Sequence, residues 1–483
     1  MQNVPKQVQN TLQQIQTQQN TRLELRKIKN HYYIYQVHSQ WNKQTKKPQK
    51  HTQYIGTITQ NGTYKPKHQK TTTTTTPATK IYEYASTQLC LNLSKDLQQA
   101  AANLPYKNEL LALSIIRATN PSPIRLAQTI WEDTYTSTKL PTNLTPKNIS
   151  QTLQTIGEMV GETYELFTQL TPKSGLLFYD LTSVLSYSKT LLLAERGYNT
   201  EWEHHNQIKV ALAFSTTTHL PVAVDVFYGS LKETKILDYF VARYTSEDLG
   251  FVIDRGFKSY ELLLELKKKG IHYVAALMKN STLLPAWVVM SGAFGYGAKK
   301  EKKRMVAFAK KRKAPYGFLY LFLDPKLHEI EEQGLLYRVS VGELSVSGYG
   351  LERRMAGVFG ILSDLDVEPQ VIYEQYKARE EIEQVFDYMK NDLEADRSYL
   401  GDDLAVRGYF VVAFLAMRLY FKILQRLHEQ KLAGKVSVRE VLFVLSKMRM
   451  IVEPNGREYL CALPKKTEEI WEVFKDLIPK TYG

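Results

Sequence analysis

The feature that most constrains the fold is a series of apolar runs between residues 174 and 279, interrupted by two stretches of helical periodicity. In chain order, the runs cover residues 175–181, 207–214, 221–227, 250–257 and 271–277. The helical stretches, 233–244 and 259–269, separate the last three runs, so the predicted order is β-β-β-α-β-α-β. Three antiparallel strands followed by crossover connections predict a mixed sheet with helices on its faces. The expected class is therefore α/β.

Two of the predicted strands carry an acid at a position that should be buried. Asp180 lies inside the first run, and Asp254 ends the apolar part of the fourth. An ionised carboxylate in such a place is unfavourable unless it is paired or binds a cation. A single acid of this kind is more often a strand-end residue that faces solvent. Two of them on one sheet instead indicate a shared site, which a third acid would complete.

A helical segment over residues 373–393 supplies the third acid, Glu383. At 100° per residue, four polar side chains fall within a stripe of about 60°. They are Tyr376, Arg379, Glu383 and Lys390. The adjoining face is apolar and consists of Ile382, Val385, Phe386 and Met389. The helix can therefore pack on the sheet and aim Glu383 at the other two acids. An ordinary amphipathic helix with a charged flank is the other reading of this stripe.

The spacing of these four polar residues, Y-(2)-R-(3)-E-(6)-K, resembles the signature of prokaryotic insertion-sequence DDE transposases. Two more segments, Leu177–Thr182 and Val252–Phe257, resemble the blocks that carry the first two acids of that family. The 129 residues from Asp254 to Glu383 are similar to the branch with a β-strand insertion between its last two acids. The resemblance implies a ribonuclease H-like core and cut-and-paste DNA transposition, in which the terminal inverted repeats are bound, cleaved and transferred.

The resemblance also implies roles for single residues. The three acids would bind two Mg²⁺ ions, with Mn²⁺ as a substitute, and Tyr376, Arg379 and Lys390 would bind DNA phosphates. Trp287, in the expected insertion, would stack on a flipped base, although a tryptophan among apolar neighbours is more often part of the core. The expected partner is double-stranded DNA, both as element ends and as target, bound by a homodimer.

Positive charge is concentrated at the N-terminus. Residues 1–80 contain 13 Lys or Arg and one acid, Glu24, and so carry +12 of the formal net charge of +14. A basic arm on a nearly neutral body indicates a polyanionic partner such as DNA, and a solvated tail that binds nothing is the alternative. A second basic cluster with nearby aromatic residues suits a DNA-contacting groove or an exposed solubilising loop. It comprises Lys299, Lys300, Lys302, Lys303, Arg304, Lys310, Lys311, Arg312 and Lys313.

The same patterns divide the chain into seven expected parts. They are a Gln-rich tail at 1–29, a basic β module with a Thr-rich linker at 30–80, a helical DNA-binding region at 85–170, the first part of the core at 174–279, a β-rich insertion at 280–365, the core helix with the third acid at 366–400, and a helical C-terminal region at 401–483. Asn61-Gly62 predicts a hairpin turn inside the β module. Short β-like runs are expected in the insertion at 287–290, 305–308, 317–323 and 339–346.

The chain has two cysteines, Cys90 and Cys461, which are too few for a disulfide framework or a cysteine-rich zinc module. The apolar run 409–417 is shorter than the roughly 20 residues of a membrane span and is followed by Arg418, so a core helix is expected. No secretory signal is recognisable at the N-terminus. These features favour a cytoplasmic prokaryotic protein, associated with the nucleoid when bound to DNA, with reduced thiols and no membrane partner.

Other functions fit parts of this pattern. A DNA-binding protein without catalysis, including an inactive transposase relic, would need the basic arm and the helical region but not three acids. Another metal nuclease on the same fold would lack the four-residue helix signature and the long insertion. A glycosidase also uses paired carboxylates, but Arg379 and Lys390 suit a phosphate better than a sugar.

Overall fold

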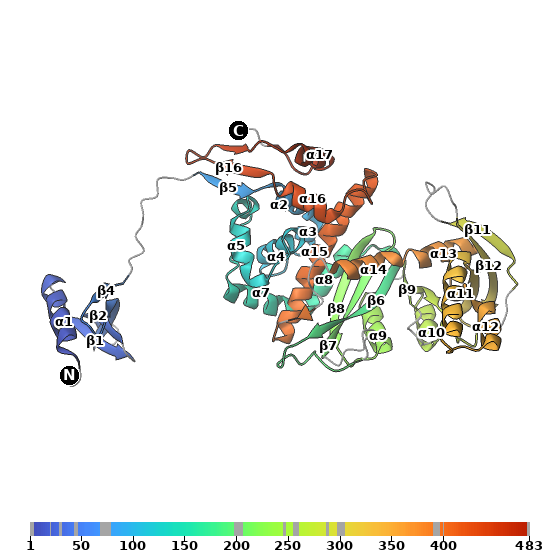
Figure 1. The fold of residues 1–483 in the computed structure, drawn as a ribbon, viewed down its shortest axis with the longest axis horizontal. Helices are drawn as coiled ribbons and strands as arrows, with labels where there is room; N and C mark the ends of the chain where they lie inside the picture. The colour runs from blue at the N-terminus through green and yellow to red at the C-terminus, as the bar shows by residue number, and fades with distance from the viewer. Residues whose placement is uncertain are drawn as a thin grey trace. The chain divides into compact units, whose positions relative to one another are not determined.

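In the computed structural model, the described residues are 4–19, 21–28, 31–42, 47–67, 79–197, 206–244, 248–254, 260–285, 289–296, 305–389, 397–398 and 400–480. The chain divides into two compact units, residues 1–78 and 79–483 (Figure 1). The threonine tract expected to act as a linker, 71–76, lies outside the described residues.

The first unit is a sheet with one helix packed on it. The helix is α1 (Lys6–Gln19), and the strands are β1 (Leu23–Ile28), β2 (His31–Asn42), β3 (Lys47–Ile58) and β4 (Tyr64–Pro66). The strands are antiparallel, in the order β1-β2-β3-β4. The predicted turn at Asn61-Gly62 joins β3 and β4, and Gly62 has the positive φ of 80° that favours glycine there.

The Gln-rich segment expected as a mobile or weakly helical tail at 1–29 is, over its described part, a helix packed on the sheet and an edge strand. Residues 6–19 are helical despite their many glutamines, because Val8, Leu12 and Ile15 recur at helical spacing and pack against the sheet. Residues 23–28 form an edge strand paired with β2. The β module therefore begins before residue 30.

The second unit is organised around the mixed sheet that the sequence predicts. Its central strands are β6 (Ser174–Ser186), β7 (Gln207–Ser215), β8 (Leu220–Tyr228), β9 (Asp248–Ile253) and β10 (His272–Ala276). On one side of β6, β7 pairs antiparallel with β6 and β8 pairs antiparallel with β7. On the other side, β9 pairs parallel with β6 and β10 pairs parallel with β9. The order is therefore β8-β7-β6-β9-β10. The crossovers are α9 (Glu233–Tyr244) and α10 (Tyr260–Lys268). The predicted order of elements is confirmed.

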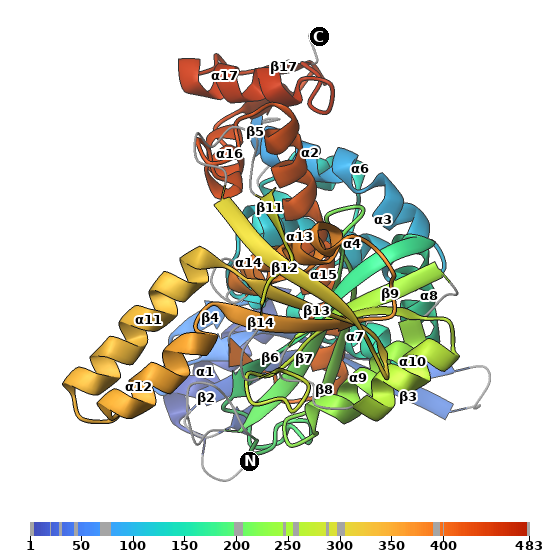
Figure 2. The ribbon, with the colours of Figure 1, turned by 90° about the vertical axis from the view of Figure 1, so that its right-hand side faces the viewer.

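The insertion continues this sheet. Its strands are β11 (Gly292–Tyr296), β12 (Met305–Ala314), β13 (Gly317–Leu323) and β14 (Val358–Ser363). They are antiparallel neighbours, and β14 pairs with β10. With the short β15 (Arg397–Ser398) beside β6, the sheet has ten strands within the described ranges. Helices α11 (Pro325–Ser340) and α12 (Val346–Glu352), then a 3-10 turn, η2 (Arg353–Met355), extend away from the strands (Figure 2).

The strand expected at 339–346 is wrong, because this run connects two helices. Ser340 ends α11, and the hydroxyl of Ser345 caps α12 by accepting a hydrogen bond from the N–H of Gly348 at 3.1 Å. The alternating Val, Ser and Leu side chains imitate a strand pattern over this connection. Of the other expected runs, 305–308 and 317–323 lie in β12 and β13, and 287–290 lies partly outside the described residues.

Residues 85–170 are mainly helical, as expected. The elements are α2 (Ala85–Leu93), α3 (Lys95–Ala100), α4 (Lys107–Thr119), η1 (Ile124–Leu126), α5 (Ala127–Glu132), α6 (Thr136–Lys139), α7 (Pro146–Glu158) and α8 (Val160–Leu170). Pro146 occupies the first turn of α7, where its missing N–H costs nothing.

The C-terminal region is only partly helical, which corrects the expectation for 401–483. Its helices are α15 (Asp403–Glu429), α16 (Val438–Leu445) and α17 (Lys465–Phe474). The strands β16 (Arg449–Val452) and β17 (Glu458–Leu460) form a second sheet with β5 (Lys80–Glu83). The antiparallel pairing of β16 with β5 ties the end of the second unit to its beginning.

α15 is a core helix. Among the described residues, this one helix is long and apolar enough to cross a membrane. However, 78% of its most apolar 18-residue window is buried inside the protein. Gly408 of α15 and Gly157 of α7 lie at the crossing of the two helices, where a Cβ on either would overlap the backbone of the other. On another side of α15, Phe421 packs on Phe214 of β7, with 5.4 Å between ring centroids. α15 therefore joins the helical region to the sheet.

Candidate active site

Asp180 and Asp254 lie at the same level of two neighbouring strands. β6 and β9 pair in parallel with Tyr179 opposite Ile253, so the next residue on each strand is an acid. Asp254 directly follows the last residue of β9. The two strands are therefore neighbours, as the sequence predicts, and the two acids lie side by side, Asp180 within β6 and Asp254 at the end of β9.

Side-chain alternation places Asp180 on the face of the sheet that meets α15. Tyr179 points to the opposite face, where it packs on Phe240 of α9 with 4.8 Å between ring centroids. Phe178 stacks on Phe214, which in turn contacts α15. Because side chains two residues apart share a face, Asp180 lies on the side of Phe178.

The segment that carries the third acid consists of two helices. They are α13 (Pro369–Lys377) and α14 (Glu380–Asp387). The single helix expected over 373–393 is therefore wrong, because the chain turns at Ala378-Arg379. In this turn the backbone N–H of Arg379 donates to the carbonyl of Tyr376 at 3.1 Å. Tyr376 and Glu383 are thus carried by different helices, and the polar stripe does not lie on one continuous helix.

α14 packs by its apolar face, as the sequence predicts. Val385, Phe386 and Met389 are buried, whereas the side chain of Ile382 lies outside the described ones. Glu383 keeps 55% of its side chain exposed. The third acid therefore stands at the open edge of the site.

Arg379 connects the acids. Its Nη2 donates to Oε1 of Glu383 at 2.7 Å, and its Nη1 forms an ion pair with Oδ1 of Asp254. The guanidinium also lies over the ring of Tyr376, 5.5 Å from the centroid. Tyr376 is buried and packs on Phe359, with 6.1 Å between ring centroids. Two acids and an aromatic ring that the sequence assigns to the site therefore meet at one guanidinium.

The site is rich in negative charge. Burial raises the pKa of Asp180 to about 6, and the carboxylates of Asp254 and Glu383 act in the same direction. The N–H of Leu181, which donates to Oδ1 of Asp180 at 2.8 Å, and the charge of Arg379 oppose this rise. A bound cation would lower the pKa of Asp180 again, because it favours the ionised carboxylate.

The donor chemistry of the site fits hard divalent cations. All three acids offer carboxylate oxygens, the ligands that Mg²⁺ and Mn²⁺ prefer. Within the described ranges, no three acidic, imidazole or thiol side chains are placed to hold one ion as they stand. Burial acts against the charge of Arg379, but its pKa is raised because Tyr376 and the three carboxylates surround it. Arg379 thus occupies one carboxylate oxygen of Asp254 and one of Glu383, and a cation that binds the same oxygens would compete with it.

Several predicted site residues lie outside the described part of the chain. They are Lys390, Trp287, and Lys299, Lys300, Lys302, Lys303 and Arg304 of the second basic cluster. The remaining cations of this cluster, residues 310–313, belong to β12. Their predicted contact with DNA stays a prediction.

Two of the β12 cations hold the sheet to neighbouring segments. Lys311 forms an ion pair with Asp366 and donates to the carbonyl of Val367 at 3.0 Å. Arg312 donates from Nη2 to the carbonyl of Leu283 at 2.7 Å. These two side chains therefore have structural partners in addition to any role in binding DNA.

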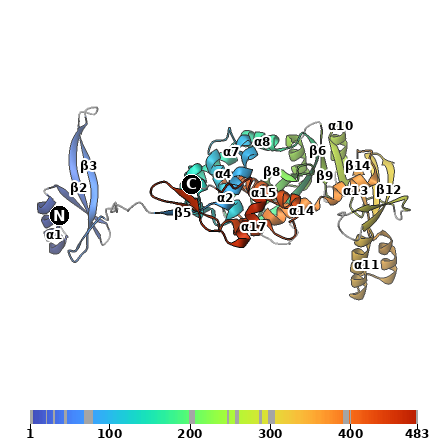
Figure 3. The ribbon, with the colours of Figure 1, turned by 90° about the horizontal axis from the view of Figure 1, so that it is seen from above.

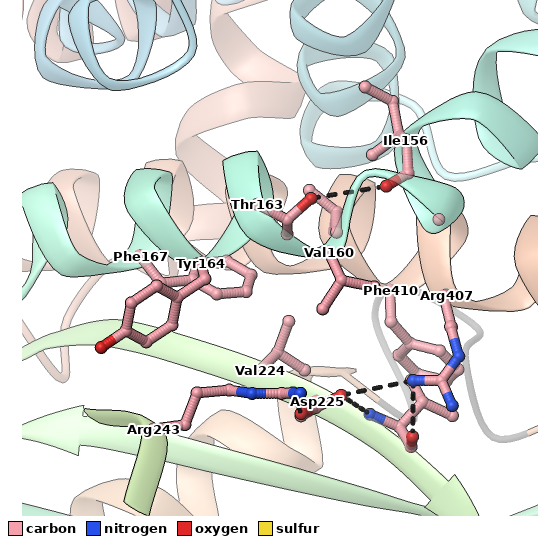
Figure 4. A pocket seen from close by; sticks show the side chains of 13 residues that line it. Ile156, Val160, Thr163, Tyr164, Phe167, Val224, Asp225, Arg243, Arg407 and Phe410 are labelled. Atoms are coloured by element: carbon pink, nitrogen blue, oxygen red, sulfur yellow. Dashed lines mark hydrogen bonds and ion pairs between the residues drawn. The ribbon is translucent and has the colours of Figure 1, made fainter. Parts of the chain in front are cut away.

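One buried acid that sequence reasoning missed has a structural role. Asp225 of β8 lines a pocket of about 40 Å³ between β8 and helices α7, α8 and α15, with room for only a few water molecules (Figure 4). Its carboxylate forms ion pairs with Arg243 of α9 at 2.6 Å and with Arg407 of α15 at 3.5 Å. Burial raises the pKa of Asp225, and the two arginines oppose the rise. Asp225 therefore links the sheet to two helices.

A second missed acid, Asp324, joins the insertion to α13. Its Oδ1 accepts from the hydroxyl of Tyr296 at 3.0 Å, and its Oδ2 accepts from the hydroxyl of Tyr373 at 2.7 Å. Lys377, at the end of α13, lies 3.4 Å from Oδ2. Burial acts to raise the pKa of Asp324, but the two tyrosines and Lys377 outweigh it, and the pKa is lowered. In the sequence, an acid before Pro325 indicates only the start of a helix.

Comparison with known proteins identifies the family. No curated protein sequence matches the chain. Among solved structures, the chain is similar to the cryo-EM structure of the piggyBac transposase synaptic complex with hairpin DNA, with a TM-score of 0.38 and 9% identity over 82% of this chain and 80% of that one. A sequence profile of the transposase DDE domain matches residues 175–419, which is half of the chain and includes all three acids. The chain therefore belongs to the DDE transposase family.

Proposed function

We propose that the protein cleaves and joins DNA strands at the ends of its mobile element, in a reaction that depends on divalent cations. The supporting observation is the meeting of Asp254 and Glu383 at Arg379, beside Asp180. The strand order β8-β7-β6-β9-β10 suits the ribonuclease H-like core that the family resemblance implies. The substrates would be double-stranded DNA, as element ends with terminal inverted repeats and as target, bound by a homodimer.

The three acids would contribute differently. Asp180 and Asp254 form the fixed part of the site, since two paired strands hold them. Glu383 can adjust, because it is more exposed and belongs to a separate short helix. Together their carboxylates would hold Mg²⁺ or Mn²⁺. When bound, these ions would polarise the scissile phosphate and lower the pKa of the attacking water.

Arg379 would have two successive partners. In the metal-free protein it neutralises two of the acids. Once these carboxylates bind cations, the guanidinium can take a DNA phosphate, for which its planar donors are suited. The ring of Tyr376 would keep the guanidinium near the site during this exchange. Lys390 and the Tyr376 hydroxyl are further predicted phosphate contacts, and Trp287 is a predicted stacking residue.

The test is cleavage of a labelled duplex that carries the element's own terminal repeat, in Mg²⁺ and in EDTA. Wild-type protein should cut at the repeat boundary and leave a 3′-hydroxyl only when metal is present. Glu383→Gln should slow cleavage by roughly a thousandfold or more, because metal ions stabilise the transition state by several kcal/mol. Glu374→Gln is the matched control, since this exposed acid of α13 contacts Gln370. Tight binding without cutting under any metal would contradict the proposal and favour a non-catalytic DNA-binding protein.

A further inference from the structure

The sheet of the first unit has one covered face and one open face. α1 packs on one face of the sheet (Figure 3). That face carries Leu23, Tyr32, Ile34 and Ile58, which are buried. Because side chains alternate along a strand, the residues between these point to the other face. Within the described part of this unit α1 is the one helix, so no helix covers that second face.

A β-bulge gathers three tyrosines on the open face. The pairing of β2 with β3 shifts between Ile34 and Tyr35 and skips Ile55, so that Tyr54 lies opposite Tyr35. The bulge thereby turns Tyr54 to the side of Tyr33 and Tyr35. The ring centroid of Tyr54 lies 6.0 Å from that of Tyr33 and 5.6 Å from that of Tyr35. All three side chains are partly exposed.

Positive charge accompanies these tyrosines. The guanidinium of Arg26, on β1, lies 4.4 Å from the ring centroid of Tyr35. A second cation, Lys65, is exposed and lies on β4, which pairs with β3 on the side away from β2. The one acid among the first 80 residues, Glu24, forms ion pairs with Arg26 at 3.0 Å and with Lys50 at 2.5 Å. The open face is therefore aromatic and cationic, and its acid is already neutralised.

We propose that this open face binds single-stranded DNA by stacking unpaired bases on Tyr33, Tyr35 and Tyr54. Aromatic rings stack on any base, and neighbouring cations bind the phosphates, a combination typical of single-strand binding. The planar guanidinium of Arg26 already lies over one ring, in a position that a base can take. A duplex fits less well, because its bases are stacked on each other and present their edges. The inference goes beyond the proposed cleavage reaction and does not depend on it.

The test compares full-length variants by fluorescence anisotropy, with a labelled oligothymidine and with a labelled duplex at one salt concentration. Tyr54→Ala should weaken single-strand binding by roughly 5- to 150-fold, the loss of stacking for one base. Tyr54→Phe keeps the ring and should bind like wild type. Duplex binding should change much less in both variants. The measurements are made in EDTA, where metal-dependent cleavage does not take place, which separates this inference from the proposed reaction.

Photocrosslinking gives a second measurement that needs no substitution. An oligonucleotide with 5-iodouracil should crosslink to at least one of the three tyrosines, as located by mass spectrometry. Equal losses for single strand and duplex in Tyr54→Ala would overturn the inference, as would an equal loss in Tyr54→Phe, because both indicate phosphate contacts instead of stacking. Crosslinks confined to residues after 78 would also overturn it and place single-strand binding in the second unit.

Discussion

Nη2 of Arg379 lies 2.7 Å from Oε1 of Glu383, so a cation of the chain already binds the most exposed acid of the site. The same guanidinium pairs with Asp254. These contacts offset part of the repulsion between the neighbouring acids. They also make the arginine a competitor of any metal ion that binds the same oxygens.

Replacing Arg379 by alanine should therefore strengthen divalent-ion binding in the absence of DNA. The two ion pairs are partly exposed and worth about 0.2–1 kcal/mol each, so the expected gain is roughly 2- to 30-fold. Calorimetric titration with Mn²⁺ measures the gain, and Arg379→Lys should fall between wild type and Arg379→Ala. Cleavage should nevertheless slow, because a phosphate ligand is lost. An unchanged Mn²⁺ affinity in Arg379→Ala would show that the guanidinium does not compete.

Asp180 should destabilise the metal-free protein at neutral pH. Its pKa is raised from 3.8 to about 6, so folding disfavours the ionised form, and stability is lost as the pH rises through that interval. In EDTA at pH 7, Asp180→Asn should raise the free energy of unfolding by about 3 kcal/mol. The gain should disappear near pH 4, where the carboxyl is protonated in the folded protein. Denaturant titration measures it, with Glu374→Gln as a neutral control, and a less stable Asp180→Asn would contradict the prediction.

The carboxylate of Asp324 should have the opposite effect. Its pKa is lowered, so its stabilisation is complete above the unfolded value of about 3.9 and is lost as the pH falls through the lower folded value. At pH 7, Asp324→Asn should cost about 1–3 kcal/mol, because hydrogen bonds to a charged group are stronger than those to a neutral one. Thermal unfolding should give a constant difference from wild type between about pH 7 and 5 and a smaller one below about pH 4. The same stability difference between Asp324→Asn and wild type at pH 7 and below pH 4 would show that the charge of Asp324 does not contribute to stability.

Gly408 should be irreplaceable at the crossing of α15 and α7. A Cβ there would overlap the backbone oxygen of Leu153, which no side-chain rotation can relieve. Gly408→Ala should therefore cost about 1–3 kcal/mol or more. Gly161→Ala, in α8, meets no atom within 4 Å and should instead stabilise by about 0.5 kcal/mol. Chemical denaturation measures the free energy of unfolding of both variants. A Gly408→Ala variant as stable as Gly161→Ala would show that α7 and α15 can move apart.

The fixed part of the site could be predicted because its causes are local. Asp180 and Asp254 each follow a run of apolar residues, and the parallel pairing of the two strands brings these positions side by side. The apolar face of α14 and of the turn after it is likewise visible in the spacing of Val385, Phe386 and Met389. In both cases the periodicity of one segment carries the information.

The remaining features depend on contacts between distant segments. The turn at Ala378-Arg379 contains neither Gly nor Pro, and it forms where α13 packs on the insertion and α14 packs on β6. The pairing of β14 with β10, which makes the insertion part of the central sheet, cannot be inferred from either strand alone. The hydrogen bonds of Asp324 with Tyr296 and Tyr373 are also invisible to local patterns.

The third acid lies on the segment that leads from the last strand of the insertion, β14, back toward the central strands. Tyr373, anchored to the insertion by Asp324, precedes Glu383 by ten residues. A shift of α13 would therefore reach Glu383 through the chain, whereas Asp180 and Asp254 are held by the pairing of β6 with β9. In the proposed reaction, such a link would couple the completion of the active site to the binding of DNA on a distant surface. Such timing would protect the host chromosome from cuts made before both reaction partners are in place.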